Sequence, residues 1–124
     1  MVSPRAAVIL KTEDLRSTIA WYEAIGFELA GAVPEDEPTW AELGRDRLIV
    51  QFVQGDTPWD GPPTLTGCLY VHPASVRSVY DQVKDVVTAE WGVEERPWGA
   101  RELTLRDPNG YFVTFTEPAG PDDS

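Results

Sequence analysis

Hydrophobic and polar positions along the first half of the chain predict a strand, a helix and three further strands. Asp14 can cap the helix, in which Leu15, Ile19 and Tyr22 recur at the helical interval, and Gly26 ends it. Strands are predicted where short apolar or alternating runs occur, at residues 6–11, 27–33, 40–43 and 48–53. The last two strands should form a hairpin about the polar turn GRDR.

The same order of elements is predicted again after a connector rich in proline and glycine. GDTPWDGPP, residues 55–63, carries three prolines and two glycines and cannot continue a sheet. Ser75, 61 positions after Asp14, can cap a second helix. Its apolar face comprises Val76, Val79, Tyr80, Val83, Val86 and Val87. Strands are predicted at residues 67–72, near 88–94, and at 100–106 and 111–117 on either side of the turn DPNG.

Two βαβββ copies predict an α+β fold in a single domain, residues 1–124. The modules are expected at about residues 5–54 and 66–117, joined by linker 55–65. Each helix should cover one face of a curved mixed sheet, and the opposite faces can meet to form an eight-stranded cup. In the last strand, alternation separates Tyr111, Val113 and Phe115 from Phe112, Thr114 and Thr116.

Composition and charge narrow the classes of function. The 21 acidic and 10 basic residues give a net charge of −11, which disfavours nucleic acid and anionic lipid surfaces and attracts cations. No stretch approaches the ~20 apolar residues of a membrane span, and the N-terminal apolar run is too short for a secretory signal. A soluble cytoplasmic protein is expected, with residues 121–124 as a polar tail. The only cysteine, Cys68, excludes an internal disulfide and is expected to be a small buried apolar residue.

The segments DLRSTIAWYEAIGF and LTLRDPNGYFVTF, at the start and end of the duplicated chain, resemble the vicinal oxygen chelate superfamily of glyoxalases, bleomycin resistance proteins and dioxygenases. The resemblance implies the glyoxalase/bleomycin resistance fold. Metal-dependent members place His or Glu on the first, fourth, fifth and eighth strands. The matching residues here are Ala7, Gln51, Cys68 and Thr114. These groups cannot hold a catalytic metal strongly, so we expect no metal and no other cofactor.

Within this superfamily, three features are most similar to the bleomycin resistance branch: RPWGARELTLRDPNG, WAELGRDRLIVQF and the acidic balance. In that branch a flat, cationic drug lies between two aromatic rings, and the resemblance places these at Trp40 and Trp98. Stacking with cation attraction can contribute about 1–3 kcal/mol per ring. The implied ligand-binding residues are Trp40, Glu42, Gln51, Cys68, Tyr70, Trp98, Glu102, Phe112 and Thr114.

Several of these residues also have structural interpretations. Trp98 could plug the end of the core, and Trp59 could either pin the connector or line a cavity mouth. The acidic residues Glu35, Asp36, Glu37, Glu90, Glu94 and Glu95 could extend a negative field, although PEDEP is also typical of a solvated loop. His72, the sole histidine, ends the fifth strand and is expected to have a structural role rather than a catalytic one.

The resulting hypothesis is metal-independent sequestration of a planar cationic antibiotic of the bleomycin type, or of a related metabolite, with no bond broken. The resemblance also implies a homodimer, often with exchange of the N-terminal strand. The alternative is a glyoxalase- or dioxygenase-type enzyme of the same superfamily, with metal ligands elsewhere or with acid–base chemistry by His72, Glu42 or Glu102. Acquired resistance and self-protection of a producer both remain open.

Overall fold

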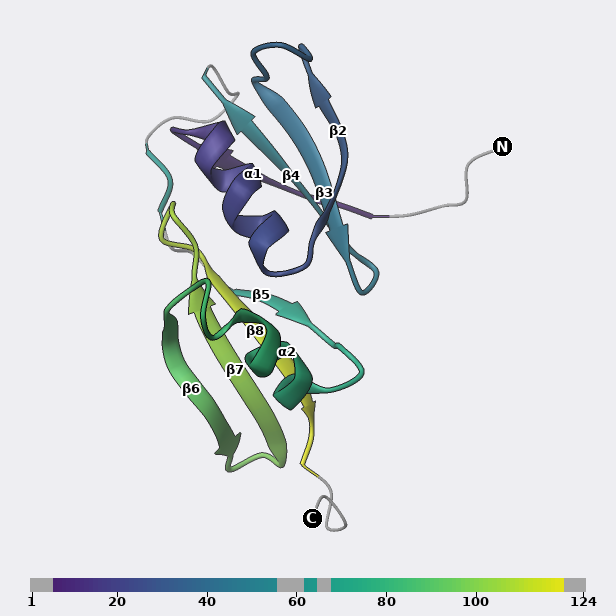
Figure 1. Ribbon diagram of the computed structural model, residues 1–124, viewed down its shortest axis with the longest axis vertical. Coiled ribbons are helices and arrows are strands. Elements are labelled where there is room, and N and C mark those ends of the chain that lie inside the picture. Colours follow the sequence, from purple (N-terminus) through teal and green to yellow (C-terminus); the bar gives the residue numbers. More distant parts are fainter. Residues whose placement is uncertain (1–5, 56–61, 65–67, 120–124) are drawn as a thin grey trace, which may run out of the picture. The chain divides into compact units, whose positions relative to one another are not determined.

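In a computed structural model the chain forms two compact units, residues 1–63 and 64–124, and each contains one βαβββ module (Figure 1). The structure describes residues 6–55, 62–64 and 68–119. The boundary between the units lies inside the expected linker. Trp59 and the expected tail at residues 121–124 lie outside the described residues. The expectation of a single domain stays a prediction.

The first unit is a four-stranded mixed sheet with one helix against one face (Figure 1). The strand order is β1-β4-β3-β2; β1 is parallel to β4 and the other pairs are antiparallel. The turn between β3 and β4 passes through Asp46 and Arg47, which both have positive φ, as the type I′ hairpin turn requires. Its elements are β1 (Val8–Thr12), α1 (Leu15–Ala24), β2 (Glu28–Val33), β3 (Trp40–Arg45) and β4 (Leu48–Gln54).

Strand alternation divides this sheet into a core face and an open face. Ala41, Leu43, Val50 and Phe52 are fully buried on the face that α1 covers. The Tyr22 ring of α1 lies 5.0 Å from the Phe52 ring and 5.1 Å from the Phe27 ring. The alternate residues of β3 and β4, among them Trp40, Glu42 and Gln51, therefore belong to the open face.

The second unit repeats this arrangement with strand order β5-β8-β7-β6 and a parallel β5–β8 pair. On the core face, Leu103, Leu105, Val113 and Phe115 are buried beneath α2, whose residues Val76, Val79 and Val83 are buried as well. The α+β fold of two βαβββ modules is confirmed. The elements are β5 (Cys68–Val71), α2 (Val76–Val83), β6 (Ala89–Arg96), β7 (Ala100–Arg106) and β8 (Phe112–Pro118).

Helix α2 is shorter than expected. The prediction continued its apolar face through Val86 and Val87, but the helix ends at Val83 and 60% of Val86 is exposed. The N–H of Val86 donates to the carbonyl of Val83, three residues earlier, so the last turn tightens and Val86 leaves the helical face. Neither helix has the length or apolar character to span a membrane, within the part of the chain that the structure describes.

A side chain near the end of the fourth strand of each module fixes the helix of that module. The Leu15 N–H of α1 donates to Gln54 Oε1 at 2.7 Å, and the Val76 N–H of α2 donates to Glu117 Oε1 at 3.2 Å. The predicted N-caps are also present: Asp14 accepts from the Ser17 N–H and Ser75 from the Ser78 N–H. The two modules thus satisfy the unpaired N–H groups of the first helical turn in the same way, with different residues.

The DPNG turn is held by the buried carboxylate of Asp107. Asp107 Oδ1 accepts from the backbone N–H groups of Asn109 and Tyr111, both at 2.8 Å. Gly110 adopts φ 92°, a value that favours glycine. The turn sets Arg106 of β7 directly opposite Phe112 of β8.

Candidate ligand-binding surfaces

A chain of hydrogen bonds joins an indole, an amide and a carboxylate on the open face of the first sheet. Trp40 Nε1 donates to Gln51 Oε1 at 3.3 Å, and Gln51 Nε2 donates to Glu42 Oε1 at 2.9 Å. Glu42 and Gln51 are direct cross-strand neighbours, and only 6% of Glu42 is exposed. Because the amide oxygen meets an N–H group and the amide nitrogen meets a carboxylate, the chain fixes the orientation of Gln51.

The Trp40 ring lies across its own strand. Nε1 reaches Gln51 on β4, while Cζ3, on the other ring of the indole, lies 3.9 Å from the position that a Cβ would take at Gly31 of β2. β4 and β2 flank β3 on opposite sides. The indole is therefore fixed at its N–H end by Gln51, while its other end reaches over Gly31, which has no side chain in the way.

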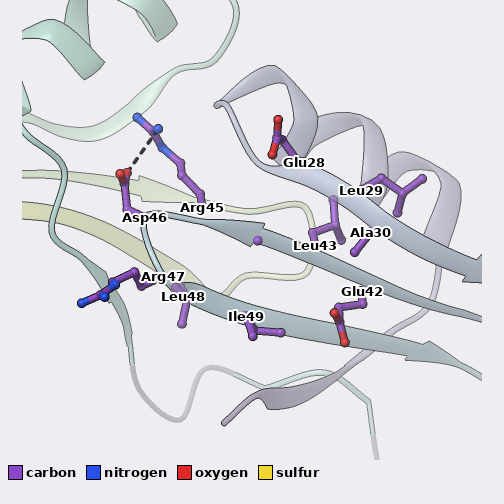
Figure 2. A pocket seen from close by; sticks show the side chains of 11 residues that line it. Glu28, Leu29, Ala30, Glu42, Leu43, Arg45, Asp46, Arg47, Leu48 and Ile49 are labelled. Atoms are coloured by element: carbon purple, nitrogen blue, oxygen red, sulfur yellow. Dashed lines mark ion pairs between the residues drawn. The ribbon is translucent and has the colours of Figure 1, made fainter. Parts of the chain in front are cut away.

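A hollow of about 390 Å³ lies at the β3–β4 hairpin of the same unit (Figure 2). Glu42 lines it, so the hollow adjoins the hydrogen-bonded chain. Figure 2 also shows the ion pair between Arg45 and Asp46, whose Nη1 and Oδ2 atoms are 3.2 Å apart. The lining residues are Glu28, Leu29, Ala30, Glu42, Leu43, Gly44, Arg45, Asp46, Arg47, Leu48 and Ile49.

On the open face of the second sheet, a thiol and two hydroxyls form a short chain. Cys68 Sγ and Thr104 Oγ1 each lie 2.9 Å from Thr114 Oγ1. The expectation that Cys68 is buried is wrong: the residue is exposed, because it belongs to edge strand β5 and its register places it on the open face beside Phe112. Partial burial raises the pKa of the thiol, while its hydrogen bond with Thr114 acts in the opposite direction.

Glu102 is the central carboxylate of this face, and only 3% of it is exposed. It accepts hydrogen bonds from Thr116 Oγ1 at 3.1 Å, Arg96 Nε at 3.4 Å and the Tyr70 hydroxyl at 3.5 Å. Desolvation raises the pKa of Tyr70, and the charge of Glu102 and its hydrogen bond with Tyr70 raise it further. Glu102 thus joins β5, β6 and β8 from its own position on β7.

Two arginines flank a pair of aromatic rings on the second module. The Trp91 and Phe112 rings pack edge to face, with centroids 5.5 Å apart. The guanidinium carbon of Arg106 lies 4.5 Å from the centroid of Phe112, and that of Arg96 lies 5.9 Å from the Trp91 ring. These are cation–π distances.

The sequence reasoning missed Trp91, Arg96 and Arg106. Arg106 could have been found, because it continues the alternation of Glu102 and Thr104 on β7. Trp91 and Arg96 had no comparable signal, since two irregularities in the β6–β7 register break the alternation of β6.

Trp98 lies in the turn between β6 and β7, and 67% of it is exposed. The alternative that it plugs the core is therefore wrong. His72 is exposed and follows the last residue of β5. The structure brings together Trp40, Glu42 and Gln51 in the first unit, and Cys68, Tyr70, Glu102, Phe112 and Thr114 in the second.

The residues at the four expected metal-ligand positions do not fit a divalent ion. Ala7 carries a methyl group, and both polar atoms of the Gln51 amide are engaged by Trp40 and Glu42. Cys68 and Thr114 are hydrogen-bonded to each other. Among the described residues, no three His, Cys, Asp or Glu side chains form a group that could bind a metal. These donors do not form the carboxylate- or imidazole-rich set that such ions prefer.

Comparison with known proteins decides the family. Residues 6–115 match the model of the Glyoxalase/Bleomycin resistance protein/Dioxygenase superfamily. The chain belongs to this superfamily. Its name covers enzymes as well as resistance proteins, so membership alone leaves the type of activity open. No curated protein matches the chain.

Several solved structures share the fold of this chain. TioX from Micromonospora sp. ML1 superposes with a TM-score of 0.82 at 21% identity, covering 94% of this chain and 99% of TioX. A bleomycin-binding protein complexed with bleomycin superposes with a TM-score of 0.70 at 23% identity, covering 93% of this chain and 98% of the bleomycin-binding protein. A bleomycin resistance determinant encoded on transposon Tn5 superposes with a TM-score of 0.71 at 22% identity, covering 94% of this chain and 98% of the determinant. At these identities the likeness shows the fold alone.

Proposed function

We propose that this protein binds and sequesters a planar cationic small molecule, an antibiotic of the bleomycin type or a related metabolite, without a metal and without chemical change. The observation that carries the proposal is the Trp40–Gln51–Glu42 chain. It holds a flat ring beside a largely buried carboxylate, and a carboxylate removed from water attracts a cation more strongly than an exposed one does.

The second module supports the same chemistry. The exposed indole of Trp98 offers a second stacking surface, and Tyr70, Phe112 and Glu102 add rings and a carboxylate. Cys68 and Thr114 supply a thiol and a hydroxyl beside them. The net charge of −11 favours capture of cations at low ionic strength.

The proposal includes a cytoplasmic homodimer with exchange of the N-terminal strand. Among the strands that the structure describes, β1 pairs with β4 alone and is an edge of its sheet, and 41% of Val8 and 49% of Ile9 on it are exposed. An edge strand with exposed aliphatic side chains is a surface that a second copy can cover. The oligomeric state is checked by sedimentation of the purified chain.

Calorimetric titration with bleomycin, mitomycin and quinoxaline antibiotics tests the binding function. Loss of one stacked ring should weaken binding about 5- to 150-fold in Trp40→Ala and in Trp98→Ala. Trp21→Phe is the matched control, because Trp21 lies on α1 and packs against Tyr22 with centroids 5.0 Å apart. Calorimetry avoids dependence on the fluorophore that the variants remove, and circular dichroism verifies their folding.

Tests on the same protein preparation distinguish a binding protein from an enzyme. A binder returns its ligand unchanged and gains nothing from added divalent ions. Elemental analysis showing about one tightly bound divalent ion per chain, together with turnover that requires that ion, would replace sequestration with catalysis. Normal affinity in both tryptophan variants would refute the assignment of Trp40 and Trp98 as stacking rings, although the protein would still be a binding protein.

A further inference from the structure

We propose that Arg106 is an internal competitor for the ligand: its guanidinium occupies the face of Phe112 on which a flat cation would stack, and binding displaces it. This inference rests on the proposed function and adds a residue that sets the choice of ligand. It concerns only the second module.

The contacts show that Arg106 places a positive group over the ring of Phe112. Its guanidinium carbon lies 4.5 Å from the centroid of Phe112, and the two residues are direct cross-strand neighbours on β7 and β8. Glu90 holds the same guanidinium with two contacts, Nη2 to Oε1 at 3.0 Å and Nε to Oε2 at 3.4 Å. A flat positive group therefore already has a ring on one side and a carboxylate beside it.

Displacement of this guanidinium is feasible because the ion pair is exposed. The Arg106 side chain is 44% exposed and that of Glu90 31%. Exposed ion pairs contribute little to stability, since water solvates both partners when they separate. The Arg106 side chain can therefore move into solvent while the Phe112 ring stays packed against Trp91.

The exchange favours one chemical class of ligand. A flat cation that replaces the guanidinium regains both the attraction of the Phe112 ring and the counter-charge of Glu90. A flat neutral molecule regains only stacking on the ring, and Glu90 then exchanges the guanidinium for water. Arg106 thus selects for aromatic groups that carry positive charge, because only such groups replace everything that its own departure removes.

The experiment compares N-methylacridinium with acridine, a neutral molecule of nearly the same shape, by fluorescence titration at neutral pH and low salt. Arg106→Gln should raise the affinity for N-methylacridinium about two- to fivefold, because the variant removes a competing, exposed cation–π contact. The wild-type protein should bind acridine more weakly than N-methylacridinium. Arg77→Gln is the matched control, since it removes one positive charge from an exposed position on α2.

A double variant locates the effect on the ring. If Arg106 competes for Phe112, the gain from Arg106→Gln should vanish in a Phe112→Leu background. The proposal is overturned if Arg106→Gln weakens binding, if its gain is no larger than that of Arg77→Gln, if the gain survives in Phe112→Leu, or if acridine binds as tightly as N-methylacridinium.

Failure of the proposed function gives a different result. If neither the wild-type protein nor any variant binds bleomycin or either probe, the protein is not a binder of flat cations and both proposals fall. If bleomycin binding is present and depends on Trp40 while Arg106→Gln brings no gain, only the competitor role is wrong. Binding that appears in Arg106→Gln and is undetectable in the wild type would support competition most directly.

Discussion

Replacement of Asp107 by alanine should destabilise the second module strongly, because this side chain holds the turn that places Arg106 opposite Phe112. Asp107 is buried, and one of its oxygens accepts the backbone N–H groups of Asn109 and Tyr111. Alanine removes the acceptor and leaves both donors in place. The perturbation therefore tests whether the DPNG sequence is required for structure rather than for contact with a ligand.

The magnitude follows from the surroundings of the two donors. Tyr111 is 7% exposed, so loss of the bond that its N–H donates to Asp107 should cost about 1–3 kcal/mol. Asn109 is partly exposed, and water can replace part of its bond, for about 1 kcal/mol more. The sum is about 2–4 kcal/mol, a large share of the roughly 5–15 kcal/mol by which a domain is stable.

Urea denaturation followed by far-ultraviolet circular dichroism measures this loss. Asp107→Asn keeps an oxygen acceptor and should cost about half as much as Asp107→Ala. Asp81→Ala is the control: its side chain is 63% exposed, lies 4.0 Å from Lys84, and should change stability by less than about 0.5 kcal/mol. A loss below 1 kcal/mol for Asp107→Ala would show that the turn relaxes and satisfies its donors without the carboxylate.

Three further predictions concern the second module. Glu102→Gln should lower the pKa of Tyr70, though not to its ordinary value, because the desolvation of Tyr70 remains. Tyrosinate absorbance measured against a Tyr70→Phe reference gives this pKa. An unchanged pKa would contradict the contact between Tyr70 and Glu102. The pH profile of Cys68 alkylation should have its midpoint above that of an ordinary thiol. Thr114→Val should move it higher still, because one pKa-lowering bond is lost; a downward shift would refute this. Glu117→Ala should cost about 1–2 kcal/mol in urea denaturation, since it frees the first N–H of α2 and removes a 3.0 Å contact with Arg101; an effect near zero would mean that water replaces it.

Secondary structure and the repeated order of elements were predictable because the spacing of apolar residues, helical in some segments and alternating in others, agrees with strong local signals at caps and turns. The caps at Asp14 and Ser75, the turn at GRDR and the DPNG hairpin all form where the sequence indicates them. The end of α2 was missed because Val86 and Val87 keep the helical spacing while the backbone has already left the helix. Apolar spacing is a weak guide where valine, a poor helix former, follows the last turn.

The candidate site was predictable only as far as alternation determines which residues share a face. It placed Trp40 with Glu42, and Phe112 with Thr114, because these strands pair in regular register. It could not place Trp91, which lies between two irregularities of β6, or show that Arg106 covers Phe112. Ion pairs and ring contacts depend on side-chain rotamers, on which hydrophobic periodicity has no bearing.

The separation of faces also explains how this fold can change its chemistry without repacking its core. In β4, Val50 and Phe52 are fully buried beneath α1, whereas Gln51 between them belongs to the open face. A substitution at Gln51 leaves this packed row untouched, so its cost is confined to the hydrogen bonds that the amide makes with Trp40 and Glu42. A TM-score of 0.82 at 21% identity to TioX shows that the fold is kept while most residues differ. The residues of the open faces, rather than the fold, must therefore decide whether a member of this superfamily binds a metal ion or a flat organic cation.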